Sequence, residues 1–103
     1  MKQKAVIINP KDNVATALVD LKAGDTLELI IAKENRAVRL ISDVPFGHKF
    51  SVAEIPDSSA VIKYGETIGL STTDIAPGEH VHIHNVASTR GRGDLEGGKG
   101  RAS

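Results

Sequence analysis

The chain of 103 residues has no cysteine and no tryptophan, and its Phe and Tyr side chains are Phe46, Phe50 and Tyr64 alone. Without cysteine, neither a disulfide nor a thiolate metal site can form, and a reducing compartment is compatible with the sequence. With so few aromatic residues, the hydrophobic core must be built from Val, Ile, Leu and Ala. The length predicts one small domain, which is short for an enzyme with a deep cleft of its own.

The chain also lacks a net charge, because thirteen basic residues balance thirteen acidic ones. A protein that binds nucleic acid or an anionic membrane needs a basic excess, so the balance argues against both partners. The apolar run at residues 5–8 is too short for a signal peptide or a membrane span. These absences predict a cytoplasmic protein.

The histidines form a conspicuous pattern. Three of the four histidines in the chain occur at alternate positions, as His80, His82 and His84. A strand over residues 78–86 would place these imidazoles on one face and the intervening apolar residues in the core. Neighbouring members, roughly 6.6 Å apart at Cα, could converge on one metal ion or substrate group, whereas the outer two are about 13 Å apart. We therefore expect a pair to act together. The alternative is a polar outer surface without a role.

The rest of the pattern is mainly that of short strands closed by turn residues. Strands are predicted at residues 5–8, 26–32, 37–41, 48–53, 60–64 and 67–71. Residues 33–36 would form the four-residue loop of a hairpin. Residues 12–18 fit either a strand or a short helix capped by Asp12 or Asn13, and we expect the helix.

An internal echo supports a compact all-β body. Residues 20–25 (DLKAGD) resemble residues 74–79 (DIAPGE), and residues 54–59 (EIPDSS) form a looser copy. In each copy an apolar residue follows an acidic one, and a turn leads into a strand. Pro77 and Gly78 fit the central positions of a type II turn, where glycine supplies the positive φ.

The composition changes near the C-terminus, where residues 88–103 are rich in glycine and nearly free of large apolar side chains. Such a segment cannot contribute to a core. We predict a domain over residues 1–87 and a flexible Gly/Arg-rich tail over residues 88–103. Its charged residues, among them Arg90, could order against a partner, and a plain flexible tail is the alternative.

Four motifs occur in order along the chain: VPFGHK (44–49), VIKYGETIG (61–69), DIAPGEHVHIHN (74–85) and RGRGD (90–94). Together they resemble the N-terminal domain of the altronate dehydratase family of sugar-acid dehydratases. The resemblance implies a mainly β fold, a small compact SAF-type β-clip domain with one or two short helices. In two-subunit relatives this domain stands as its own chain, so the resemblance also implies a small subunit that works with a separate large subunit.

The family reaction is a β-elimination of water from a 2,3-dihydroxy acid, which yields a 2-keto-3-deoxy acid. The resemblance implies a divalent metal, Fe²⁺ or Mn²⁺, which stabilises the enediolate that forms when the C2 proton leaves. The poor leaving group on C3 needs a general acid, and histidine suits that task.

On this hypothesis the histidines take different roles. His48 is the predicted catalytic acid or base, because a turn places it at a strand start; a core-edge histidine bonded to a backbone carbonyl is the alternative. His82 and His84 are the predicted metal ligands, and this pair needs a third ligand from elsewhere. His80 is expected to face solvent at the turn.

Three further residues are candidates for substrate binding. Lys63 and Tyr64 could meet a substrate carboxylate or hydroxyl, although a solvated charge for Lys63 and a packing role for Tyr64 are the alternatives. Arg90 could clamp a carboxylate bidentately or contact the partner subunit. The sequence assigns no general base, which the large subunit could supply.

Two other functions fit the same sequence. One is a non-catalytic SAF-type module that binds a carbohydrate or a metal, and the other is the alpha subunit of a sulfolactate sulfo-lyase. The alternating histidines weigh against a purely structural module. The sequence does not choose among altronate, galactarate and sulfolactate as substrates, and the chain could also form a homo-oligomer.

Overall fold

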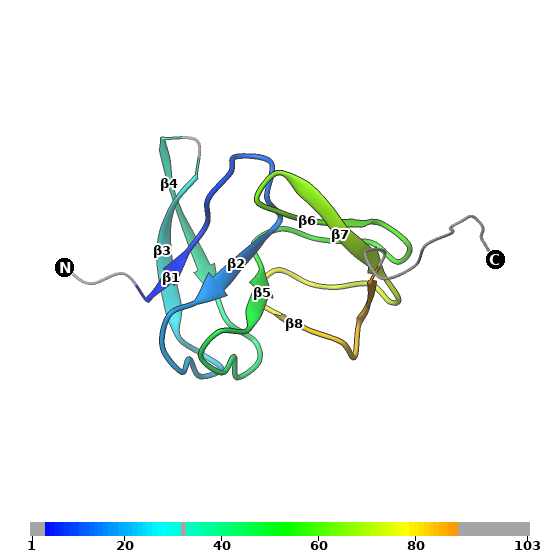
Figure 1. The fold of residues 1–103 in the computed structure, drawn as a ribbon. Helices are drawn as coiled ribbons and strands as arrows, with labels where there is room; N and C mark the ends of the chain where they lie inside the picture. Colours follow the sequence, from blue (N-terminus) through cyan, green and yellow to red (C-terminus); the bar gives the residue numbers. More distant parts are fainter. Residues whose placement is uncertain (1–3, 32, 89–103) are drawn as a thin grey trace.

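The computed structural model describes residues 4–31 and 33–88, which fold entirely into strands, turns and bends (Figure 1). The strands of this part are β1 (Ala5–Val6), β2 (Val14–Ala17), β3 (Thr26–Ile31), β4 (Glu34–Arg39), β5 (Lys49–Ser51), β6 (Ala60–Lys63), β7 (Glu66–Ser71), β8 (His80–Val81) and β9 (Val86–Ser88). The predicted mainly β class is therefore confirmed. The predicted short helices are wrong for the described residues, and no helix there could cross a membrane.

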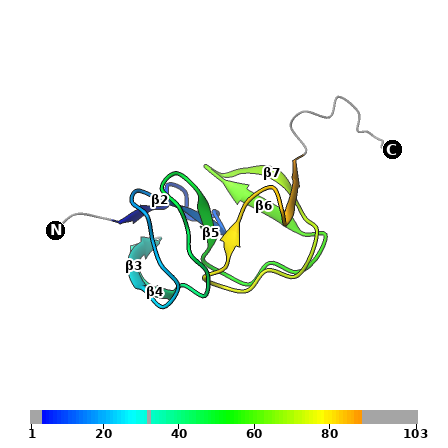
Figure 2. The same cartoon turned by 90° about the horizontal axis from the view of Figure 1, so that it is seen from below.

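The strands form three antiparallel sheets. The central sheet has the order β1-β2-β5-β8, the hairpin β3-β4 forms the second, and β6-β7-β9 form the third. Figures 1 and 2 show the central sheet between the β3-β4 hairpin and the β6-β7 hairpin. This arrangement brings β5 and β8, which are far apart in sequence, side by side in the middle of the domain.

Two aliphatic clusters form the core, as the scarcity of aromatic residues predicted. The larger one packs the β3-β4 hairpin against the central sheet, around the fully buried Phe50. The smaller one lies between the central sheet and the β6-β7 hairpin. Its buried members are Val14, Ile55, Val61, Ile75 and Val81. Because Val81 belongs to this cluster, β8 is anchored where the histidine tract begins.

The segment at residues 12–18 shows why the helix prediction failed. Asp12 accepts a hydrogen bond from the Gly65 N–H (2.8 Å), and Asn13 accepts one from the Ile62 N–H (2.8 Å). The two side chains that could have capped a helix are therefore engaged by the distant β6-β7 hairpin. Residues Val14–Ala17 then continue as strand β2, which pairs with β1 and β5.

The first predicted hairpin has a shorter loop than expected. Strand β4 begins at Glu34, which pairs with Ile31, so residues 34–36 extend the strand instead of the loop. Lys33 has a φ of 70°, as a tight hairpin turn requires. In the β6-β7 hairpin, Tyr64 and Gly65 have φ values of 57° and 76°, which is the pattern of a type I′ turn.

The internal echo corresponds to one loop conformation that occurs four times. Each copy closes a turn in which the fourth residue donates its N–H to the first carbonyl, at residues 22–25, 45–48, 56–59 and 76–79. The third residue has positive φ in every copy: Gly24, Gly47, Ser58 and Gly78. The positive φ predicted for Gly78 is confirmed. The copy at residues 43–48 was not recognised in the sequence.

The four copies associate in two pairs. Leu21 forms an isolated bridge with Val44, and Ile55 forms one with Ile75. In the first pair each copy also caps the other: the Asp20 carboxylate accepts the Phe46 N–H, and the Asp43 carboxylate accepts the Ala23 N–H, both at 2.9 Å.

The second pair has only half of this arrangement. The Asp74 carboxylate accepts the Asp57 N–H at 2.9 Å. The corresponding donor for Glu54 would be residue 77, which is Pro77 and has no N–H. The acidic residue that begins each copy therefore accepts a backbone N–H from the paired copy wherever that position has an N–H to donate.

Candidate functional site

The recurrent loop explains the position of His48. Its equivalents Asp25 and Glu79 each accept the N–H of the first residue of their own turn at 3.0 Å. In the copy that carries His48 the first residue is Pro45, which has no N–H to donate. The imidazole of His48 instead contacts His80 at the start of β8.

Three histidines meet where β5 and β8 pair. Nδ1 of His48 lies 2.8 Å from Nε2 of His80, and the His48 and His82 rings stack with centroids 4.1 Å apart. One ring nitrogen of each of the three lies within 4.8 Å of the others. We call His48, His80 and His82 the histidine cluster. Among the described residues, it is the only group of three or more His, Asp or Glu side chains whose ligand atoms lie close enough together to hold a metal ion.

The predicted strand over residues 78–86 is wrong beyond Val81. Strand β8 ends there, and residues 82–85 turn back so that the Asn85 N–H donates to the His82 carbonyl (3.2 Å). Ile83 is 84% exposed, which corrects its expected place in the core. The chain direction changes between His82 and His84, so the simple alternation of a strand does not hold.

Asn85 holds this turn in place and was not singled out from the sequence. Its side chain is buried, accepts the His82 N–H at 2.9 Å and donates to the His80 carbonyl at 2.9 Å. Asn85 therefore ties together the backbones of two members of the histidine cluster. The signal for it was the preference of asparagine for turns, which the strand pattern of the histidine tract masked.

The structure arranges the predicted histidines differently from the sequence hypothesis. His82 lies with His48 and His80, whereas His84 is outside the cluster and contacts His80, with centroids 5.2 Å apart. His80, which was expected to face solvent, is only partly exposed and lies at the centre of these contacts. The catalytic role of His48 and the metal-binding role of His82 and His84 stay predictions.

The surroundings of His80 and His82 favour the neutral form of these two imidazoles. Burial, with a further contribution from His48, lowers the pKa of His80 below its ordinary value of 6.5. Burial also lowers the pKa of His82, and the nearby charges of His48 and Lys49 lower it further. A neutral imidazole carries the lone pair that binds a metal ion, so these shifts suit a metal site.

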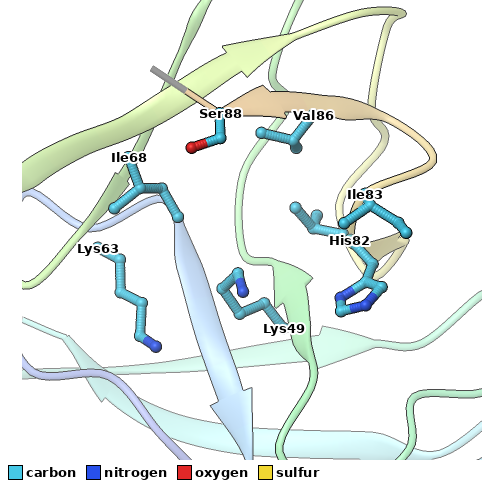
Figure 3. Close-up of a pocket in the computed structure, with 8 residues that line it drawn as sticks. Lys49, Lys63, Ile68, His82, Ile83, Val86 and Ser88 are labelled. Atoms are coloured by element: carbon cyan, nitrogen blue, oxygen red, sulfur yellow. The ribbon is translucent and has the colours of Figure 1, made fainter. Parts of the chain in front are cut away.

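A pocket of about 290 Å³ lies beside His82 (Figure 3). Its lining residues are Lys49, Lys63, Ile68, Val81, His82, Ile83, Val86 and Ser88. In Figure 3, Lys49 lies between Lys63 and the imidazole of His82. Burial, together with the positive charge of Lys63, lowers the pKa of Lys49. Lys49 was not singled out from the sequence, where it was read as part of a strand and of the VPFGHK motif.

The predicted substrate-binding residues have different positions. Lys63 lines the pocket, and its Nζ lies 4.8 Å from the centroid of the Tyr64 ring. Tyr64 is 56% exposed at the hairpin turn and is not among the residues that line the pocket. Arg90 and the rest of the predicted tail after Ser88 lie outside the described residues, and Ser88 itself belongs to β9. The domain boundary at residue 87 stays a prediction.

Comparison with known proteins places this site in a family context. The family model of the altronate/galactarate dehydratase SAF domain matches residues 3–89. Altronate dehydratase of Escherichia coli (strain K12) is 46% identical over 79 residues, which cover 77% of this chain and 15% of that protein. The chain thus spans only a small part of the length of this relative and of the altronate dehydratase of Bacillus subtilis (strain 168), also 15%.

A second kind of relative is similar along nearly its whole length. The (2R)-sulfolactate sulfo-lyase subunit alpha of Chromohalobacter salexigens is 33% identical over 88 residues, which cover 82% of this chain and 94% of that protein. The mainly β fold and these similarities agree with the resemblance read from the sequence. The chain belongs to the altronate/galactarate dehydratase SAF domain family.

Proposed function

We propose that this chain is the small subunit of a metal-dependent sugar-acid dehydratase. Together with a separate large subunit it would eliminate water from a 2,3-dihydroxy acid and form a 2-keto-3-deoxy acid. The single observation that carries the proposal is the histidine cluster, three imidazoles whose ring nitrogens lie within 4.8 Å of one another. The similarity to altronate dehydratases supports the reaction class.

The donors of the cluster fit a divalent metal ion. His48, His80 and His82 would hold it through nitrogen, and burial already favours the neutral form of His80 and His82. Imidazole suits Fe²⁺ better than Mn²⁺, which prefers oxygen ligands, so the donor set favours iron between the two expected metals. When bound, the ion would supply positive charge to stabilise the enediolate.

Two roles of His48 would compete at its Nδ1 atom: binding a metal ion and sharing a proton with His80. The Nδ1 atom that lies 2.8 Å from His80 either lends its lone pair to an ion or shares a proton with the other ring. If His48 held the ion through this nitrogen, another group would have to serve as the proton donor. Metal content measured alongside activity separates these two roles.

Exposed apolar side chains that are close in sequence to two of the clustered histidines support a partner that completes the site. Phe46, two residues before His48, is 66% exposed, and Ile83, next to His82, is 84% exposed. The buried centre of a protein interface is more apolar than the rest of the protein surface. A large subunit packed on these two turns would exclude water from the histidines and the pocket.

The test is reconstitution. The full chain, co-expressed with the large dehydratase polypeptide of the same genome, is purified with its native metal and assayed with altronate, galactarate and sulfolactate. We expect activity from the complex on a sugar acid and none from the chain alone. Release of sulfite from sulfolactate would favour the alternative of a sulfo-lyase alpha subunit, which the match along that subunit's length supports.

A negative outcome is equally clear. Turnover by the isolated chain would contradict the need for a large subunit. A chain that binds sugars, but neither a metal nor a large polypeptide, would favour a non-catalytic carbohydrate-binding module instead.

A further inference from the structure

We infer that the pocket beside His82 is a binding site for the carboxylate of an acidic ligand, with Lys49 and Lys63 as the residues that hold it. The inference deepens the proposed function, because it names the part of the substrate that this chain would bind. It assigns Lys49, which neither the motifs nor the resemblance singled out, to a direct contact with the ligand.

The first argument is the origin of the two lysines. Lys49 begins β5 in the central sheet, and Lys63 ends β6 in a different sheet, yet both line the same pocket. Both side chains are partly buried. The positive charges of two lysines that line one pocket repel each other, and an anion bound between them removes that cost.

The second argument is the composition of the walls. Four of the lining residues are aliphatic: Ile68, Val81, Ile83 and Val86. Apolar walls lower the local dielectric and strengthen the attraction between an ammonium group and a carboxylate. The lining residues of the described chain include no carboxylate, so no acidic side chain of the wall already occupies the position of the anion.

The third argument is continuity with the histidine cluster. His82 belongs both to the cluster and to the lining of the pocket. A ligand with its carboxylate at the lysines can therefore extend toward the imidazoles. A volume of about 290 Å³ is at the lower end for ligand pockets and suits a small acid.

The test compares three ligands with the same carbon chain: galactarate has two carboxylates, galactonate has one and galactitol has none. Each is titrated into the full chain without added metal, and binding is followed by NMR. We expect both acids to bind and to shift the amide signals of Lys49, Lys63 and Val86. Binding of galactitol as tight as that of galactonate would overturn the inference.

Matched variants locate the site. Lys49→Gln and Lys63→Gln should each weaken galactonate binding about tenfold, because each removes a charged hydrogen-bond donor. Lys11→Gln removes an exposed lysine outside the pocket and should leave the affinity unchanged. The NMR spectrum of each variant verifies its fold. Unchanged affinity in both pocket variants, or a loss limited to galactarate, would contradict a site for the carboxylate that the two acids share.

Failure of this inference can be told apart from failure of the proposed function. Ligand binding is measured without partner or turnover, so an inactive complex would refute the dehydratase and leave a positive binding result standing. An active complex with an unchanged KM for Lys49→Gln would refute the carboxylate site alone. Binding of Co²⁺ by Lys49→Gln should match that of the unaltered chain, which shows that the neighbouring His48 is undisturbed.

Discussion

Nδ1 of His48 and Nε2 of His80 lie 2.8 Å apart, at a distance where one ring donates an N–H and the other accepts it. If both rings were fully protonated, two N–H groups would face each other and the contact would break. The pair links a turn residue to a strand residue 32 positions away in sequence. Its protonation state therefore bears on the stability of the domain as well as on its chemistry.

We predict that the metal-free chain loses stability as the pH falls below about 6.5, the pKa of an unperturbed histidine. The pKa values of His80 and His82 are lower in the folded chain than in the unfolded chain. Between the two sets of pKa values the unfolded chain therefore binds more protons than the folded chain, so acid favours unfolding. This contribution to stability is complete above the unfolded pKa and is lost as the pH falls through the lower folded values. Thermal unfolding between about pH 8 and pH 5 measures it.

The control for this pH dependence is a pair of variants. His80→Gln should flatten the decline of the melting temperature with falling pH, because one of the shifted groups is gone. Lys11→Gln, which changes an exposed loop residue, should retain the decline of the unaltered chain. Equal slopes in all three proteins would show that the histidine cluster does not control acid stability.

A second prediction concerns metal binding by the full chain. His48→Gln, His80→Gln and His82→Gln should each weaken Co²⁺ binding strongly, because each removes one of the three nitrogen donors that could hold the ion. His84→Gln is the matched control from the same tract and should bind as the unaltered chain does. The visible absorption of bound Co²⁺ reports affinity and ligand set. A loss in His84→Gln as large as that in His80→Gln would instead support the ligand pair predicted from the sequence.

Asn85→Ala should destabilise the chain by about 1–3 kcal/mol, because it leaves two backbone groups without their side-chain partner. These groups are the His82 N–H and the His80 carbonyl. Urea unfolding measures the loss. Asn85→Asp keeps the acceptor for His82 but loses the donor to His80, so it should retain part of the stability. If Asn85→Ala were as stable as the unaltered chain, the turn at residues 82–85 would not depend on this side chain.

The class of fold was predictable because it rests on local patterns: short β-branched runs and turn residues occur throughout the chain. The burial alternation of β3, with Leu27, Leu29 and Ile31 inside, is visible directly in the sequence. The helix prediction failed because Asp12 and Asn13 have their partners about 50 positions away, at Gly65 and Ile62. A sequence window cannot reveal such a partner, and the tertiary bonds override the local capping preference.

The sequence predicted that the candidate site is built from histidines, but it did not predict which histidines lie together. The alternation of His80, His82 and His84 drew attention to the correct tract, while the buried Asn85 ends the strand behaviour on which the pairing argument depended. His48 joins the cluster because β5 pairs with β8, a contact between distant segments. The turn that places His48 at a strand start was visible in the sequence, but its partner His80 was not.

A further prediction addresses the exposed side chain of Ile83, next to the cluster member His82 in sequence. Ile83→Lys should leave the melting temperature of the chain nearly unchanged, because Ile83 is 84% exposed, but should weaken co-purification with the large subunit. Ile30→Lys is the control: Ile30 is 62% exposed on β3, in the hairpin on the other side of the central sheet. Equal retention of the large subunit by both variants would exclude Ile83 from the interface.

The recurrent loop allows a matched test of backbone strain. Gly24, Gly47 and Gly78 occupy the same turn position with φ values of 94°, 84° and 85°. A Cβ at Gly24 or Gly47 would meet nothing within 4 Å, whereas a Cβ at Gly78 would clash with the Arg39 carbonyl. Alanine at Gly24 or Gly47 should therefore cost only the conformational strain of about 1–2 kcal/mol.

Gly78→Ala adds the steric clash to the same strain, so it should destabilise the chain by clearly more than the other two variants. The added Cβ would meet backbone atoms of Arg39 and Leu40, so rotating a side chain cannot relieve the clash. The Gly78 carbonyl also accepts the Ile41 N–H, so a shift at this position disturbs the packing of the loop against the end of β4. Urea unfolding of the three variants measures the difference. Equal losses at all three glycines would mean that strain alone, and not the close approach of the loop to the end of β4, sets the cost at Gly78.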